Sequence, residues 1–214
     1  AFEIDYGFVR VLKGLFSEYE NFCIVKGDVL KTLCSQKNLP ARIFGNLPYN
    51  SAFAIISDIL EMEILPQHMV FTLQKEAAHR MVAGPGTKDY SSLSVLCTSV
   101  CDVRILFDIG SSAFWPRPRV TSSVVQLIPK KKSMSALERK DFSDFVRAAF
   151  SSRRKTLRNT LRFWIKQRSP FLDEAKIDTQ LQGVLEELGI ESSIRAEALA
   201  PDELFAIYRQ LQSI

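Results

Sequence analysis

The chain has 214 residues, of which 46% are hydrophobic and 24% are charged, and its net charge is +4. This composition is ordinary for a soluble globular protein. Apolar runs all fall short of the ~20 residues that a membrane-spanning helix needs. The opening residues, AFEIDYGF, lack the basic start of a signal peptide, so we expect neither feature.

The histidine and cysteine residues argue against a metal site. The histidines are His68 and His79, and the cysteines are scattered through apolar sequence at Cys23, Cys34, Cys97 and Cys101. Metal sites usually place cysteines in C-x-x-C pairs or close to histidines. We therefore expect buried, reduced thiols, a cytoplasmic protein and no bound metal.

Strand-like and helix-like segments alternate through the first 129 residues. The apolar and β-branched runs predict strands at residues 1–4, 22–27, 41–44, 68–74, 102–109 and 122–129. The helical patterns between them cover residues 9–19, 51–62, 75–83 and 91–100. Such alternation favours a mostly parallel sheet covered on both faces, with ligands at the carboxyl ends of its strands.

The rest of the chain has only helical patterns. Phe142, Phe145, Val146 and Ala149 repeat with helical spacing, and Leu157, Leu161 and Trp164 form an apolar seam further on. Further helices are expected at residues 181–190 and 201–211. We therefore expect two domains, an α/β domain at residues 1–132 and a small all-α domain at residues 133–214.

Positive charge is concentrated at the domain boundary and in the first part of the all-α domain. Residues 130–168 carry thirteen basic and three acidic side chains, whereas residues 1–129 are neutral overall and residues 169–214 carry a net charge of −6. Such a block suggests a polyanionic partner. A solvated helix face explains it equally well, with Lys155, Arg158, Arg162 and Lys166 lying beside the seam on one helix.

Two carboxylates follow the first two predicted strands. Glu3 is placed to accept hydrogen bonds from the hydroxyl groups of a ribose, although Asp5 lies nearby. Asp28 is placed to accept a hydrogen bond from the amino group of an adenine, although it also suits a helix N-cap.

The segment GNLPYN, residues 45–50, follows the strand at residues 41–44 and precedes a helix. The side-chain oxygen of Asn46 and the backbone carbonyl of Leu47 suit the two N–H bonds of an adenine amino group. Pro48 stiffens the turn, and Tyr49 offers a ring for stacking on the extruded base. The alternative is a plain turn with an aromatic residue packed on the helix below.

The segment SSAFWPRPRV, residues 111–120, combines aromatic, proline and arginine residues. Phe114 and Trp115 beside Arg117 and Arg119 suit a flipped base and its flanking phosphates. The alternative is an edge loop whose aromatic side chains belong to the core.

At these residues the chain resembles the ribosomal RNA adenine N6-dimethyltransferases of the kasugamycin-sensitivity type. The matching segments run in the family's order along the chain: FEID, GD, FGNLPYN, LQKEAAHRMVAGPGTKDYSSLSV, SAFWPRPRVTSSVV, SSRRKTLRNTL and RAEALAPDELFAIYRQL. The resemblance implies a Rossmann-like class I methyltransferase sheet followed by a small helical domain. It also implies an enzyme that moves methyl groups from S-adenosylmethionine to adjacent adenines of small-subunit rRNA during ribosome biogenesis, acting as a monomer on the pre-30S particle.

The resemblance assigns roles to individual residues. It implies that Glu3, Asp28 and Asn46 bind the cofactor, that Asn46, Leu47 and Tyr49 form the catalytic motif, and that Tyr49 and Phe114 stack on the target base. The expected RNA contacts are Arg117, Arg119, Arg153, Arg154, Lys155, Arg158 and Arg162.

The resemblance also has a gap. The family's first strand and the glycine-rich loop that holds the methionine part of the cofactor precede the FEID segment. We therefore expect a chain trimmed at its N-terminus, a break in the sheet and impaired cofactor binding. The alternatives are a dimethyltransferase of the antibiotic-resistance type, which acts on large-subunit rRNA, and a non-catalytic RNA-binding assembly factor.

Overall fold

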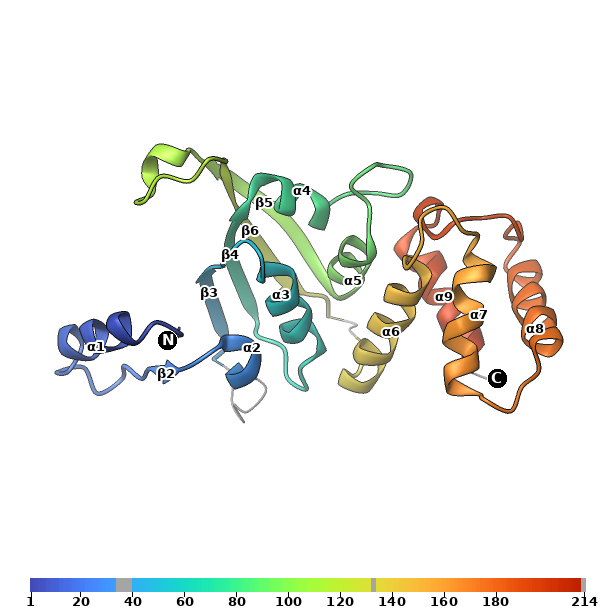
Figure 1. The fold of residues 1–214 in the computed structure, drawn as a ribbon, viewed down its shortest axis with the longest axis horizontal. Coiled ribbons are helices and arrows are strands. Elements are labelled where there is room, and N and C mark those ends of the chain that lie inside the picture. Colours follow the sequence, from blue (N-terminus) through green and yellow to red (C-terminus); the bar gives the residue numbers. More distant parts are fainter. Residues whose placement is uncertain (34–39, 132–133, 213–214) are drawn as a thin grey trace.

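The computed structural model describes residues 1–33, 40–131 and 134–212. Its first part contains the strands, and its last part contains helices (Figure 1). The strands are β1 (Phe2–Glu3), β2 (Val25–Lys26), β3 (Arg42–Asn46), β4 (His68–Gln74), β5 (Cys101–Ile109) and β6 (Ser122–Pro129). The helices among them are α1 (Tyr6–Leu15), α2 (Val29–Thr32), α3 (Ala52–Glu61), α4 (Lys75–Met81) and α5 (Ser92–Val100).

The strands form two separate sheets. One is the parallel pair β1-β2, and the other has the order β3-β4-β6-β5. The expected break in the sheet is therefore present between β1 and β3, and Figure 1 shows β2 apart from β3.

Three of the four strands of the larger sheet, β3, β4 and β5, run in the same direction as expected, and β6 alone runs the opposite way. β3 pairs with β4 in parallel, but β4 and β5 both pair with β6 in antiparallel fashion. The physical reason is the connection between β5 and β6, which contains only the short 3-10 helix η2 (Ser111–Ala113). A parallel pair is usually joined by a crossover through an α-helix, which this connection lacks, so the chain turns back as a hairpin.

The helices α3 and α5 contribute to the core on one face of this sheet. Burial alternates along β4, with Met69, Phe71 and Leu73 buried and the residues between them only partly covered. Phe44 on β3 is 70% exposed. Within the described ranges, the expected covering of both faces is therefore not found.

Several predicted boundaries differ from the structure, and the helix expected at residues 181–190 spans Glu174–Glu187. The strand expected at residues 22–27 covers only Val25–Lys26, because Gly27 adopts φ 132° and the Phe22 ring packs on Phe16 instead. The helix expected at residues 9–19 spans Tyr6–Leu15, and it begins where Asp5 caps the amide of Phe8. β3 continues to Asn46, past the expected end of the strand.

The cysteines give a mixed result. Cys97 and Cys101 are buried as expected, whereas Cys23 is exposed in the segment before β2, which corrects that expectation. The expectation for Cys34 lies outside the described residues.

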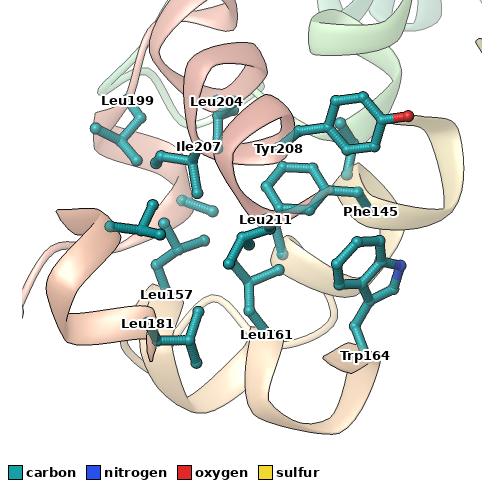
Figure 2. Close-up of a cluster of buried hydrophobic side chains, with 14 of the residues drawn as sticks. Phe145, Leu157, Leu161, Trp164, Leu181, Leu199, Leu204, Ile207, Tyr208 and Leu211 are labelled. Carbon is teal, nitrogen blue, oxygen red and sulfur yellow. The ribbon is translucent and has the colours of Figure 1, made fainter. Parts of the chain in front are cut away.

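The C-terminal helices are α6 (Ala136–Ala149), α7 (Leu157–Arg168), α8 (Glu174–Glu187) and α9 (Pro201–Leu211), with a 3-10 helix η3 (Ala196–Ala198). Figure 2 shows the predicted seam of Leu157, Leu161 and Trp164 facing the apolar side chains of α9, and the apolar faces of both helices are buried in one cluster. This cluster also takes in Tyr90 and Val95, and the hydroxyl of Tyr90 donates to the carbonyl of Leu199 at 2.8 Å.

Arg139 on α6 joins the helical part to the sheet part. It is only 3% exposed, and its Nε donates to the carbonyl of Leu60 at the end of α3 at 2.7 Å. Its other nitrogens donate to the carbonyls of Met62 and Met134. α3 is also the helix that follows the GNLPYN segment, so the helical part is fixed against the element that carries this segment.

Candidate active site and RNA interface

The carboxyl end of β3 presents two acceptors without partners. Asn46 is exposed, and its side chain has no hydrogen-bond partner among the described residues. The amide of Leu47 donates to the carbonyl of Thr72 on β4 at 3.2 Å, but the Leu47 carbonyl accepts no hydrogen bond from the described residues. The next carbonyl, that of Pro48, accepts from the amides of Ser51 and Ala52 and so starts α3.

Gly45, within β3, leaves room for the side chain of Leu47 beside these acceptors. A Cβ atom at this position would lie 3.0 Å from Cδ2 of Leu47 and 3.4 Å from Cδ1 of Phe71. A larger residue would therefore push the end of the Leu47 side chain aside by a few tenths of an ångström.

Tyr49 is held by a contact from a distant strand. Its hydroxyl lies 3.1 Å from Oγ of Ser122, the first residue of β6, and Ser122 is fully buried. The Tyr49 side chain is 39% exposed. The ring is therefore anchored at one end and accessible to a base.

Asn46 and Leu47 line a cavity of about 430 Å³ between the two sheets. Its other wall includes Ala1 and Phe2 at the start of β1, and its floor includes Ile55 and Ile59 of α3. The volume lies within the ~300–1,000 Å³ of small-molecule sites.

The two predicted cofactor carboxylates lie at the ends of neighbouring strands. Glu3 pairs in register with Lys26, two residues before Asp28. One oxygen of Glu3 accepts from the amide of Asp5 at 2.8 Å, and one oxygen of Asp28 caps α2 through the amide of Leu30 at 3.0 Å. Each carboxylate keeps one oxygen without a partner in the described part of the chain.

Phe114, Trp115, Arg117 and Arg119 lie on the connection between β5 and β6, which projects from the body in Figure 1. Trp115 is 96% exposed, so it does not belong to the core, whereas Phe114 is partly buried. Arg117 donates from Nε to Oγ of Ser111 at 3.0 Å. Arg119 is exposed without a partner in the described ranges.

Two of the predicted RNA-binding arginines form ion pairs within the protein. Arg162 makes a bidentate contact with Asp178 on α8, at 2.7 Å to Oδ1, and these hydrogen bonds raise the pKa of its guanidinium. Arg153 donates to Glu197 at 2.8 Å and to the carbonyl of Lys88 at 2.7 Å.

The other three predicted RNA-binding residues of this block are free in the described structure. Arg154, Lys155 and Arg158 have side chains without hydrogen bonds or ion pairs to described residues. Lys155 lies before α7, which begins at Leu157, so its expected place on the same helix as Arg158 is wrong. Lys166 is on α7 and donates to the carbonyl of Leu172 at 2.6 Å.

Ser122 anchors Tyr49 without any signal of that role in the sequence. It stands in an apolar strand, and only the sheet register places it beside the GNLPYN segment. The described residues contain no cluster of three or more possible metal ligands. None of the helices in the described ranges has the length and apolar character needed to cross a membrane.

A family model described as ribosomal RNA adenine dimethylase matches residues 1–197 of the chain. The chain belongs to this family. The match covers both the sheet and most of the helical part, so the expected family is confirmed, and the expected enzyme class is confirmed at the level of the family.

Relatives of this dimethylase family include several proteins named ribosomal RNA small subunit methyltransferase A. The protein from Treponema denticola is 42% identical over 205 residues, which cover 94% of this chain and 68% of that protein. The protein from Borreliella afzelii is 43% identical, over 75% of this chain and 56% of its own length. The protein from Treponema pallidum is 34% identical over the whole of this chain and 73% of its own length.

Solved structures confirm the expected fold class. A dimethyladenosine transferase from Plasmodium falciparum matches with a TM-score of 0.79 at 24% identity, over 99% of this chain and 81% of that chain. The 23S rRNA methyltransferase ErmE matches with a TM-score of 0.61 at 18% identity, over 99% of this chain and 80% of that chain. Because both identities are below 25%, these two matches support the fold of the chain and nothing more.

Proposed function

We propose that the protein transfers methyl groups from S-adenosylmethionine to N6 of adjacent adenines in small-subunit rRNA during ribosome biogenesis. The observation that carries this proposal is the pair of unpartnered acceptors at the end of β3 in the described chain, the Asn46 side chain and the Leu47 carbonyl, beside the anchored ring of Tyr49. The names of the relatives support the small subunit as the source of the RNA.

The chemistry of an adenine amino group explains why two acceptors are needed. Its nitrogen lone pair is delocalised into the ring and is therefore a weak nucleophile. Hydrogen bonds from its two N–H groups to Asn46 Oδ1 and the Leu47 carbonyl favour a more tetrahedral nitrogen, and these contacts strengthen towards the transition state. S-adenosylmethionine, when bound, would supply the methyl group to this nitrogen, and the nitrogen would release its proton to solvent.

The base itself is held by aromatic side chains in this proposal. The Tyr49 ring stacks on the extruded adenine, and Phe114 from the β5–β6 connection supplies a second apolar surface. Because Ser122 fixes the Tyr49 hydroxyl, the ring is already oriented before the base arrives.

The nucleoside half of the cofactor fits the residues present. S-adenosylmethionine supplies an electrophilic methyl group when it is bound. Glu3 and Asp28 lie at the ends of the paired strands β1 and β2, and each keeps a carboxylate oxygen free among the described residues, for a ribose hydroxyl and for the adenine amino group respectively. Asn46, at the end of β3 in the larger sheet, is the acceptor that orients the target amino group.

The helical part, residues 133–214, is proposed as the RNA-binding domain that follows the methyltransferase domain at residues 1–132. Arg154, Lys155 and Arg158 carry charge that no described residue pairs, and Arg117 and Arg119 contribute from the β5–β6 connection. Phosphate contacts by Arg153 and Arg162 require their ion pairs with Glu197 and Asp178 to be shared or opened. We further propose that the enzyme acts as a monomer in the cytoplasm, where it meets pre-30S particles.

A methyl-transfer assay with the full-length protein tests this function. We expect dimethyladenine to appear in the rRNA of undermethylated small subunits, measured by mass spectrometry of the digested RNA. Methylation of large-subunit rRNA instead would identify the antibiotic-resistance type. RNA binding without methylation of either subunit would leave a non-catalytic assembly factor.

A further inference from the structure

The helices α6 and α7 enclose a groove of about 770 Å³ that lies outside the β3 site. The two helices are neighbours in the helical part of the chain (Figure 1). One wall comes from Asp144 and Ala148 of α6 and from the following turn, and the other comes from α7. A volume of this size accommodates a small molecule or a short piece of a polymer.

The α7 wall of the groove has a row of three side chains with an aromatic ring in the middle. Asn159, Phe163 and Gln167 are four residues apart, so they share one face of the helix. Phe163 is 67% exposed, while Leu161 fills the core from the opposite side of the helix and the buried Trp164 lies between the core and the groove. The core is therefore complete without Phe163.

Asn159 and Gln167 have side-chain amides without hydrogen-bond partners among the described residues. A side-chain amide offers a donor and an acceptor in one plane, which matches the edges of nucleobases. The exposed ring of Phe163 lies about one helical turn from each amide and offers a face on which a base can stack.

The charges around the groove favour a polyanion. Lys155 lines one end of it, and Arg154 and Arg158, which no described residue pairs, adjoin Lys155 along the chain. The carboxylate of the lining residue Asp144 lies 3.3 Å from Arg147, which also pairs with Glu61 at 2.7 Å. The lining residue Arg168 is matched by Asp141.

We infer that the α6–α7 groove binds an unpaired segment of RNA, with a base stacked on Phe163, base edges at Asn159 and Gln167, and a phosphate at Lys155. This inference rests on the proposed function for the kind of RNA, because the enzyme would meet it in the small subunit. The groove shares no residue with the β3 site, so it holds nucleotides other than the adenine being methylated.

Fluorescence anisotropy with the full-length protein tests the groove directly. The probe is a fluorescein-labelled, unstructured RNA of about ten nucleotides, titrated at several salt concentrations. Phe163→Ala should weaken binding roughly 5- to 150-fold, the usual range for removal of one base–aromatic stack, and leave the salt dependence unchanged. Lys155→Ala should reduce the slope of log K against log salt by about 0.7.

Phe171→Ala is the matched control, because Phe171 is fully exposed at 102% in the connection after α7 and does not line the groove. It should bind the probe as the wild type does. Ultraviolet cross-linking of the same RNA should label the peptide that contains Phe163, and Asn159→Ala with Gln167→Ala should reduce that labelling.

Equal affinities of the wild type and Phe163→Ala would overturn the inference, and so would equal losses in Phe163→Ala and Phe171→Ala. The inference would also be overturned if the wild type did not bind the RNA probe, or if the groove bound a ribosomal protein and no RNA. These binding results are independent of methyl transfer, so they separate failure of the groove from failure of the proposed function.

Discussion

The hydroxyl of Tyr49 lies 3.1 Å from the hydroxyl of Ser122, although the two residues are 73 positions apart in the chain. This contact ties the GNLPYN segment to the first residue of β6. Tyr49 therefore has an anchored hydroxyl and an exposed ring. Tyr49→Phe removes only the hydroxyl, whereas Tyr49→Ala removes both.

Tyr49→Ala should lower kcat/KM for methyl transfer roughly 5- to 150-fold, because it removes stacking worth ~1–3 kcal/mol. Tyr49→Phe keeps the ring and should stay much closer to the wild type. Steady-state kinetics of the full-length enzyme on undermethylated small subunits measures both. Equal losses in the two variants would place the importance of Tyr49 in its hydroxyl and not in stacking.

Asn46→Ala should reduce kcat much more than it changes KM, since one of the two acceptors on the amino group acts mainly in the transition state. The fold should survive, because the Asn46 side chain is exposed and makes no hydrogen bond within the described protein. Asn21→Ala, which changes another exposed asparagine, is the control. Unchanged turnover in Asn46→Ala at normal thermal stability would remove Asn46 from the mechanism.

The basic block should separate into two classes of residue. The triple change of Arg154, Lys155 and Arg158 to Ala should weaken RNA binding and reduce the salt slope by about 0.7 for each phosphate of a single strand that is no longer neutralised. Arg162→Ala should instead affect mainly the packing of α7 on α8, because its charge is matched by Asp178. A salt titration of RNA affinity compares the two, and a larger slope change for Arg162→Ala would contradict this division.

Arg139→Met should destabilise the whole chain by about 3 kcal/mol, because it leaves buried carbonyls without their donor and each unsatisfied acceptor costs ~1–3 kcal/mol. The carbonyls concerned are those of Leu60, Met62 and Met134. Burial lowers the pKa of the Arg139 guanidinium, although the group remains charged at neutral pH. Thermal unfolding of Arg139→Met and of its exposed neighbour Lys140→Ala measures the difference, and similar midpoints would show that the contact is dispensable.

The cysteines should differ sharply in reactivity. Burial raises the pKa of the Cys101 thiol to about 12 and raises that of Cys97 well above its ordinary value, so both remain protonated and shielded at a pH of about 8. Cys23 is exposed. Brief alkylation followed by peptide mapping should label Cys23, with Cys97 and Cys101 labelled only after denaturation. Rapid labelling of Cys97 in the native protein would show that the α5 region opens readily.

Much of the fold follows from local patterns in the sequence. The alternation of His68–Gln74 and the β-branched run Ser122–Pro129 predict β4 and β6 at their observed bounds. The seam of Leu157, Leu161 and Trp164 predicts the buried face of α7. These features are visible because burial imposes a period of two on strands and of 3.6 on helices, and the residues concerned are close in the chain.

Tertiary structure alone decided the features that depend on distant partners. The sequence shows thirteen basic residues between positions 130 and 168 but not that Asp178 and Glu197 neutralise two of the arginines. It shows the strands but not that β6 lies between β4 and β5 and so brings Ser122 to Tyr49. The physical reason is that a charge or a hydroxyl finds its partner through chain packing, and no local periodicity records which distant residue that partner will be.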